Sequence, residues 1–214
     1  MGLIRGTVKH LIKKIISPVS DVITPQVDKI TTAIDEKEQA KMRKFMEQKV
    51  NHARLLVEDL NALKKDSLRA VNDRKEMKYE ILRDRKMGKT VVTVHSIVGR
   101  ELGRVVENKS LIEDVLLKDD AVRKYEIFIG EQKIGEVISK GSEPKKITMD
   151  YAGLSLHGNE AGMECWVLKE KGECLMVASR KAYGDSGKAY LLEVADPKEE
   201  LRCLLISLAI NMAG

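Results

Sequence analysis

Four residues near the end of the chain have the types and order of a serine nucleophile. Gly184-Asp185-Ser186-Gly187 matches the sequence around the reactive serine of one class of proteases, in which glycine N–H groups hold the oxyanion. His95 and His157 precede this serine, as the chain order of such triads requires. Lys188, however, stands where a second glycine belongs, and the chain is too short for the two barrels of that fold. We therefore interpret the four residues as a loop between strands and expect no catalytic residue.

The other residues capable of chemistry do not form a recognisable site. Gly187-Lys188 lacks the earlier glycine and the following Ser or Thr of a phosphate loop. The histidines are scattered and join no cluster of Cys or carboxylates: His10, His52, His95 and His157. Lys118-Asp119-Asp120 lacks the alternating oxygen ligands of a calcium loop. We expect no metal and no cofactor.

The three cysteines, Cys165, Cys174 and Cys203, lie in hydrophobic stretches without metal-ligand spacing. An odd, small number of cysteines does not suit a disulfide framework, so we expect a reducing compartment. The expected location is the cytoplasm, with the protein peripheral on the inner face of the membrane. No apolar run reaches the roughly 18 residues of a transmembrane helix.

Charge divides the chain into two regions. Residues 1–90 hold 21 Lys and Arg against 13 Asp and Glu, whereas the remainder holds 17 against 20. No Gly or Pro occurs from Gln26 to Met87, while 13 of the 15 glycines lie from Gly88 onward. With 33% charged and 43% hydrophobic residues, the chain is neither a disordered polyelectrolyte nor an integral membrane protein. We expect a change of construction near residue 88.

Residues 1–24 are predicted to form a basic amphipathic helix. Apolar residues at helical spacing make one stripe flanked by cations, a pattern typical of contact with an anionic membrane. The proposed lipid contacts are Leu3, Ile4, Arg5, Val8, Lys9, Leu11, Ile12, Lys13, Lys14 and Ile15. Packing on a partner or on the rest of the chain would explain the same stripe.

Residues 25–88 are predicted to be a helical oligomerisation region. A heptad of apolar residues can be followed, and its proposed oligomer seam is Met42, Met46, Ala53, Leu56, Leu60 and Leu63. A single helix and a helical hairpin that folds back near Asn72-Asp73 both fit, and both need a partner surface. We therefore expect a coiled coil or helical hairpin that forms a homo-oligomer or joins a larger assembly.

The second region is predicted to consist of short strands. Tyr125–Ile129 and Ile134–Ile138 flank a Gly-containing turn as a hairpin. A second hairpin turns at Lys171-Gly172, which places Cys165 opposite Ala178 rather than Cys174 and argues against a disulfide. Further strands are expected at 146–150, 154–157 and 189–195.

The chain ends in a helix that has no polar face. Asp196 and Pro197 suit its start, and residues 201–212 are apolar on every side yet too short to span a membrane. Strands followed by such a helix indicate strands wrapped around it. The predicted fold class is α+β: long N-terminal helices, followed over 89–214 by an antiparallel β-barrel around a central helix at 197–213.

Two stretches resemble the tubby C-terminal-like superfamily, in particular its LURP-one-related and phospholipid-scramblase-like members. YEIFIGEQKIGEVISK at 125–140 is similar to the paired-strand repeat, and VASRKAYGDSGKAYLLEVADPKEELRCLLISLAINMA at 177–213 is similar to the family ending. The family barrel has twelve strands, whereas eight or nine are visible here, with Val91–Val94 and Leu111–Leu117 as further candidates. We expect a trimmed or open barrel. Members end the helix with Ala-Ile-Asp, and Asn211 here argues against a charge role at that place.

The resemblance implies a binding or scaffolding module that acts at membranes and is not an enzyme. Basic residues that would face an anionic headgroup are Lys133, Lys140, Lys145, Lys146, Arg180, Lys181 and Lys188. The sequence leaves two other functions open. One is a structural subunit of a larger assembly with no lipid role. The other is a nucleic-acid-binding protein, suggested by the basic run around Arg83, Arg85, Lys86 and Lys89.

Overall fold

The chain folds into a closed barrel of twelve antiparallel strands. The computed structural model describes Lys37, Ala40 and residues 52–63, 65–86, 89–108, 122–140, 145–150, 153–160, 163–180 and 188–214. Each strand pairs with the next along the chain, and β1 pairs with β12 to close the ring. The strands are β1 (Ala53–Glu58), β2 (Ser67–Val71), β3 (Met77–Lys86), β4 (Lys89–Ser96), β5 (Glu101–Asn108), β6 (Val122–Ile129), β7 (Gln132–Lys140), β8 (Lys146–Met149), β9 (Gly153–Asn159), β10 (Glu164–Lys169), β11 (Cys174–Ser179) and β12 (Ala189–Val194).

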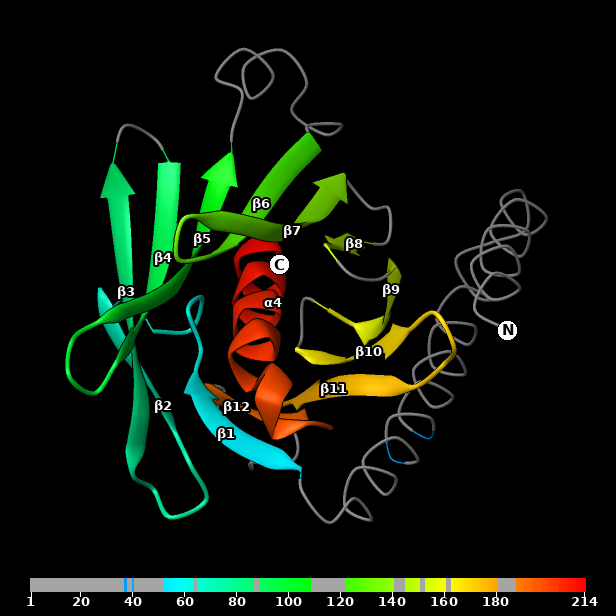
Figure 1. The fold of residues 1–214 in the computed structure, drawn as a ribbon, viewed down its shortest axis with the longest axis horizontal. Coiled ribbons are helices and arrows are strands. Elements are labelled where there is room, and N and C mark those ends of the chain that lie inside the picture. The colour runs from blue at the N-terminus through cyan, green and yellow to red at the C-terminus, as the bar shows by residue number, and fades with distance from the viewer. Residues whose placement is uncertain are drawn as a thin grey trace, which may run out of the picture.

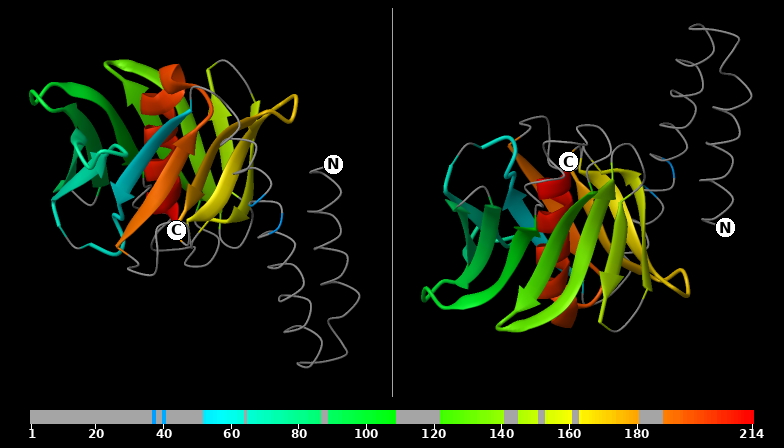
Figure 2. Two further views of the ribbon diagram at one scale, coloured as in Figure 1. Left: turned by 90° about the horizontal axis from the view of Figure 1, so that it is seen from below. Right: turned by 90° about the horizontal axis from the view of Figure 1, so that it is seen from above.

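The barrel is filled by α4 (Glu200–Ala213), which follows the short 3-10 turn η2 (Pro197–Glu199). Asp196 caps this turn by accepting a hydrogen bond from the Lys198 N–H at 3.0 Å. Residues 203–211 are all buried, and strands surround the helix in Figures 1 and 2. The predicted apolar helix inside an antiparallel barrel is confirmed. No helix in the part of the chain that the structure describes is long and apolar enough to cross a membrane.

The predicted N-terminal long helices are wrong for residues 53–86, which form strands, while Lys37 and Ala40 are helical. Residues 53–86 contain β1, β2 and β3, so the barrel begins at Ala53 and not near residue 89. Within the predicted oligomer seam, Ala53 and Leu56 lie in β1, while Leu60 is buried in the barrel core and Leu63 packs against it. A buried core residue is not available to a coiled-coil partner. Met42, Met46 and the predicted helix at 1–24 lie outside the described residues.

The turn between β2 and β3 explains this error. The chain reverses at Asn72-Asp73, where the fold-back of a helical hairpin was predicted, but it joins two strands. The Asn72 side-chain oxygen accepts hydrogen bonds from the N–H groups of Arg74 at 2.9 Å and Glu76 at 3.0 Å. Lys75 has a left-handed φ of 62°, a conformation that glycine more often takes. Because no Gly or Pro marks this turn, the apolar spacing alone favoured a helix.

The expectation of a trimmed or open barrel is also wrong. The three strands β1, β2 and β3 supply what the sequence left missing, and the pairing of β1 with β12 closes the sheet. The candidate strand Val91–Val94 lies within β4, as predicted. The candidate strand Leu111–Leu117 lies outside the described residues.

The hairpin of β10 and β11 has the predicted register. Cys165 pairs with Ala178, and Cys174 pairs with Leu168. All three cysteines are buried and free. Burial raises the pKa of the Cys165 thiol to about 12, so this side chain stays protonated and unreactive at neutral pH.

Close contact between β5 and α4 depends on Gly103. A Cβ placed on this residue would lie 2.8 Å from Leu205 Cδ1 and 2.7 Å from the carbonyl oxygen of Phe128. Phe128 belongs to the neighbouring strand β6, so its backbone cannot rotate away as a side chain would. Any side chain at position 103 therefore forces the strand away from the helix.

Gly103→Ala is expected to lower the free energy of unfolding by about 1 to 3 kcal/mol, because it overpacks the core. Urea unfolding followed by circular dichroism measures the loss. Gly153→Ala is the matched control, since its nearest neighbour would be the flexible Glu170 side chain, with Oε1 at 2.8 Å. Equal losses in the two variants would contradict the close-packing argument.

Candidate functional site

The C-terminal end of α4 is held by the loop that follows β1. Asn211 Oδ1 accepts a hydrogen bond from the Leu60 N–H at 2.9 Å. The Asn61 amide donates to the Asn211 carbonyl oxygen at 2.6 Å. Asn211 Nδ2 donates to Asp59 Oδ2 at 3.4 Å. Every polar group of the Asn211 side chain therefore has a partner in this loop.

Asp59 is a fully buried carboxylate at the centre of this cluster. Its Oδ1 accepts hydrogen bonds from the N–H groups of Asn61 at 2.8 Å and Ala62 at 3.0 Å. Its Oδ2 accepts from Arg180, both from Nε at 3.0 Å and from Nη2. Because a buried charge needs a partner, the Arg180 guanidinium is used to neutralise Asp59.

This cluster explains why an amide stands at position 211, where the resembling family has an acid. An aspartate there would lack the N–H that Asn211 donates to Asp59, and it would place a second carboxylate beside a buried one. Two carboxylates this close cannot both ionise at low cost. Asn211 therefore has a structural role that its neutral charge makes possible.

The N-terminal end of α4 is held by β3. Glu200 is 4% exposed, and its carboxylate accepts from Lys78 Nζ at 2.8 Å and from the Tyr79 hydroxyl at 2.7 Å. Burial and this hydrogen bond raise the pKa of the Tyr79 hydroxyl above its ordinary value. The loop after β1 and strand β3, which the sequence assigned to a helix, thus hold the two ends of the central helix.

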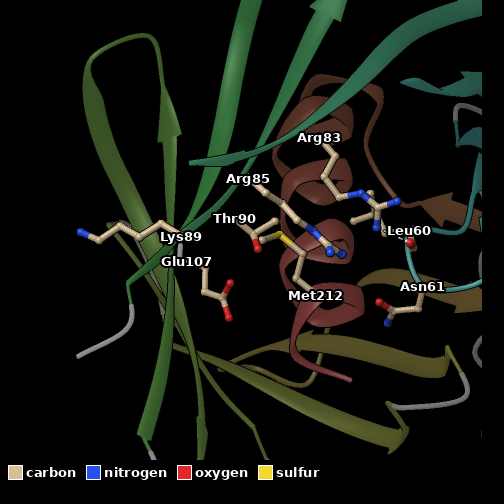
Figure 3. A pocket seen from close by; sticks show the side chains of 8 residues that line it. All are labelled: Leu60, Asn61, Arg83, Arg85, Lys89, Thr90, Glu107 and Met212. Atoms are coloured by element: carbon tan, nitrogen blue, oxygen red, sulfur yellow. Dashed lines mark hydrogen bonds between the residues drawn. The ribbon is translucent and has the colours of Figure 1, made fainter. Parts of the chain in front are cut away.

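Beyond the end of α4 the inside of the barrel becomes polar. Inward-facing positions that carry Ile81 and Val105 further down the strands carry Arg83, Arg85 and Glu107 here. They surround a cavity of about 360 Å³, which we call the barrel mouth. It is lined by Leu60, Asn61, Arg83, Arg85, Lys89, Thr90, Glu107 and Met212 (Figure 3).

Arg83 holds the loop beside the barrel mouth. Its guanidinium donates to the carbonyl oxygens of Leu60 at 2.6 Å, Leu63 at 2.9 Å and Lys65 at 2.7 Å. Burial lowers the pKa of Arg83 and the positive charge of Arg85 lowers it further, while the negative charge of Asp66 raises it. The three acceptors are neutral, so they satisfy the donors of Arg83 without neutralising its charge.

Arg85 and Lys89 are the other cations of the barrel mouth. Neither side chain makes a hydrogen bond or an ion pair with the described residues. In Figure 3 the Arg85 guanidinium points toward Met212 and the loop, whereas the Lys89 ammonium points away from the other labelled groups. Glu107, 6% exposed, is the acidic residue of the lining. The lining is therefore positive on balance.

In the basic run considered for nucleic-acid binding, the two arginines lie on the inner face of β3. Arg83 and Arg85 face the barrel mouth, and Asp84 lies between them on the opposite face of β3. Lys89 begins the next strand, across the hairpin.

Of the seven basic residues predicted to contact a headgroup, the structure describes all but Lys181. Lys133 donates to Glu126 at 2.7 Å and to Glu136 at 2.8 Å. Lys145 donates to Glu160 at 3.0 Å and is largely buried. Lys133, Lys145 and Arg180 therefore form ion pairs with acids of the same chain.

The remaining predicted cations are exposed: Lys140, Lys146 and Lys188. Lys140 ends β7, Lys146 begins β8, and Lys188 immediately precedes β12. Since neighbouring strands are antiparallel, these three places lie at the end of the barrel where β3 ends and the mouth opens. The structure thus brings these three predicted residues to one end of the barrel. Lys133, near the start of β7, lies at the other end.

The residues of the considered protease triad are not assembled in the described part of the chain. Gly184–Gly187 lies outside it. His95 bonds the Gly99 carbonyl at 3.2 Å, and His157 stacks on Trp166 with ring centroids 5.8 Å apart. No group of three metal-ligating side chains occurs among the described residues.

The opposite end of the barrel carries exposed apolar side chains that the sequence analysis did not single out. Met77 is 42% exposed, Ile97 66% and Val98 83%, and they are the large hydrophobic residues exposed within the described ranges. Tyr79 pairs with Ser96, so Met77 at the start of β3 and the tip after β4 belong to neighbouring hairpins. We call these three residues the apolar corner.

Unpaired cations surround the apolar corner. Arg74, Lys75 and Arg100 are exposed, and their side chains form no ion pair with the described residues. Two nearby acids are in ion pairs, Asp73 with Arg54 at 3.9 Å and Glu101 with Arg104 at 3.0 Å. Glu76 accepts from the neutral Asn72 amide at 2.9 Å and keeps its charge, so three cations face one uncompensated acid. The corner combines apolar surface with positive charge.

Comparison with known proteins bears on the fold. No family model and no curated protein matches the chain. The structure is similar to a solved X-ray structure of a protein from Arabidopsis thaliana, AT5G01750, with a TM-score of 0.50 and 10% sequence identity. The match covers 77% of this chain and 93% of that chain. This likeness is consistent with a barrel fold.

Asn211→Asp is expected to lower the free energy of unfolding by about 2 to 4 kcal/mol at neutral pH, because it adds a buried carboxylate beside Asp59. Repulsion raises the pKa of the carboxyl pair, so the folded state binds more protons than the unfolded chain. The variant should therefore regain stability relative to the wild type as the pH falls toward about 4. Urea unfolding of both proteins across this range measures the difference, and a pH-independent difference would contradict the argument.

Proposed function

We propose that this chain is a non-enzymatic, membrane-associated binding protein of the tubby and LURP-one-like type. The closed barrel around a central helix and the similarity to the Arabidopsis thaliana structure support the fold part of this proposal. The observation that carries the membrane part is the apolar corner with its unpaired cations. The N-terminal stripe at residues 3–16 is the second attachment in this proposal.

The hairpin that carries Ile97 and Val98 is held rigidly. The Ser96 N–H donates to the Arg100 carbonyl at 2.9 Å, and the Gly99 N–H donates to the Ser96 carbonyl at 2.9 Å. Gly99 has a φ of 77°, which closes the turn without strain. A fixed tip loses little conformational entropy when it enters a headgroup layer, so its apolar contacts contribute more of their free energy to binding.

The magnitudes fit a weak, reversible attachment. Moving one Val or Ile side chain out of water is worth about 1.5 to 3 kcal/mol. Each cation near an anionic surface adds about 1 kcal/mol. Ordering and desolvation offset part of this sum, so stable association needs a second attachment, as lipid anchors do. The basic stripe at the N-terminus has the composition for that role.

Replacing Ile97 and Val98 together by Glu is expected to reduce binding of the full chain to phosphatidylserine-containing vesicles at least about tenfold, because it removes apolar burial and reverses the local charge. Co-sedimentation with anionic and neutral vesicles measures this. Lys171→Glu on the β10–β11 turn is the matched control, since it changes the net charge by the same two units at a site without apolar residues. Ile12→Glu in the full chain tests the N-terminal stripe separately.

A wild-type protein that does not sediment with anionic vesicles would contradict membrane association and favour a structural subunit. If the double variant and the Lys171→Glu control lose the same amount of vesicle binding, the loss reflects net charge and not a contact made by the apolar corner.

Insertion of the apolar corner into the headgroup layer is expected to change the emission of an environment-sensitive dye attached to the Val98→Cys variant. The three native cysteines are buried, so an exposed thiol at this position is labelled selectively. A blue shift of an environment-sensitive dye on addition of anionic vesicles, and no shift with neutral ones, is the predicted result. An unchanged emission spectrum while the protein sediments would place the contact elsewhere.

A further inference from the structure

We propose that the barrel mouth binds a small soluble anion that carries a phosphate group, at the end of the molecule opposite to the membrane contact. The pocket is built from inward-facing positions of β3 and β4, the loop after β1 and the last turn of α4. It is distinct from the apolar corner, and its ligand is held by the guanidinium of Arg85. The assignment of a soluble source rests on the proposed membrane contact at the corner.

The electrostatics of the pocket favour a bound anion. The guanidinium groups of Arg83 and Arg85 share one cavity, and the donors of Arg83 are taken up by neutral carbonyl oxygens. Arg85 has no partner among the described residues and points into the cavity (Figure 3). Glu107 is the one acid of the lining, whereas the Lys89 ammonium points away from the other labelled groups (Figure 3). A phosphate placed against Arg85 relieves the repulsion between the two guanidinium groups.

The pocket also has the size and the neutral donors for such a ligand. Its volume of about 360 Å³ is that of a small-molecule site. The Thr90 hydroxyl and the Asn61 amide line it and are able to donate to phosphate oxygens. Leu60 and Met212 give it an apolar side. A planar guanidinium with neutral donors around it suits a tetrahedral oxyanion that accepts two parallel hydrogen bonds.

The position of the pocket separates it from the membrane contact. Strand β3 begins at Met77 in the apolar corner and reaches the mouth at Arg85. Over these residues a strand extends roughly 25 to 30 Å. A bilayer touched by the corner therefore lies on the far side of the barrel, and the ligand reaches the mouth from solution.

A purely structural role for the arginines gives a different expectation. Cations are favourable near the C-terminus of a helix, and the last turn of α4 lies at the mouth. In that case Arg85→Gln lowers stability to the same extent in phosphate and in chloride. A binding site instead makes stability depend on the concentration of phosphate.

The test is a titration of the full chain with inorganic phosphate and with glycerol 3-phosphate, at constant ionic strength, followed by calorimetry and by thermal unfolding. Wild-type protein is expected to show saturable binding, and Arg85→Gln to bind at least about tenfold more weakly, since charge-assisted hydrogen bonds are lost. Lys188→Gln removes a cation at the same end but outside the pocket and is expected to bind like the wild type. Arg85→Lys keeps the charge and is expected to fall between the two.

Absence of saturable phosphate binding to the wild type would overturn the proposal, whether or not Arg85→Gln folds. Equal binding by Arg85→Gln and the wild type would overturn it as well. Binding of phosphatidic acid vesicles without binding of either soluble phosphate would overturn the soluble source. The Ile97 and Val98 double variant is expected to keep phosphate binding while it loses vesicle binding, so the pocket and the membrane contact are tested independently.

Discussion

A helix without a polar face imposes the main constraint on this fold. From Cys203 to Asn211 every residue of α4 is buried, so no side of the helix can be left to water. A flat sheet covers one side of a helix, whereas a closed ring of strands covers all of them. Closure also removes both sheet edges, which would otherwise expose unpaired backbone groups. The apolar helix therefore requires the closed barrel. Because the pairing of β1 with β12 closes the ring, both strands are needed to cover the helix.

The same constraint produces the two polar ends. The helix has to be fixed along the barrel axis, and apolar contacts do not fix its position along that axis well. Buried hydrogen bonds do: Glu200 is held at one end by Lys78 and Tyr79, and Asn211 at the other by the loop after β1. Where the helix stops, the inward positions of the longer strand β3 no longer face apolar side chains. Charged residues are tolerated there, and a cavity follows from the mismatch in length between helix and strands.

The sequence predicted the features that depend on local pattern. The helix start at Asp196, the register of Cys165 against Ala178 and the hairpin around Gly130 follow from capping and turn chemistry, and all three are found. The first three strands were missed because their turn carries Lys75 where glycine would have marked it. Over short stretches, the apolar pattern of a heptad and the alternating pattern of a strand select many of the same positions. In residues 53–86, only the turns distinguish a helix from strands. The barrel mouth was missed for the same reason, because Arg83 and Arg85 face inward only once β3 is a strand.

The proposed membrane contact and the proposed ligand site lie at opposite ends of the barrel. The apolar corner at Met77 and the cavity at Arg85 are joined by β3, which pairs with β2 as far as Leu82 and with β4 from Tyr79 to Lys86. This connection fixes the orientation of the two ends relative to each other. A close-packed barrel around a helix has low compressibility, so we expect little change of shape to pass from one end to the other. A protein of this construction presents one end to solution whenever the other touches a surface. Under the two proposals, function depends on where the molecule is held and on what the mouth binds.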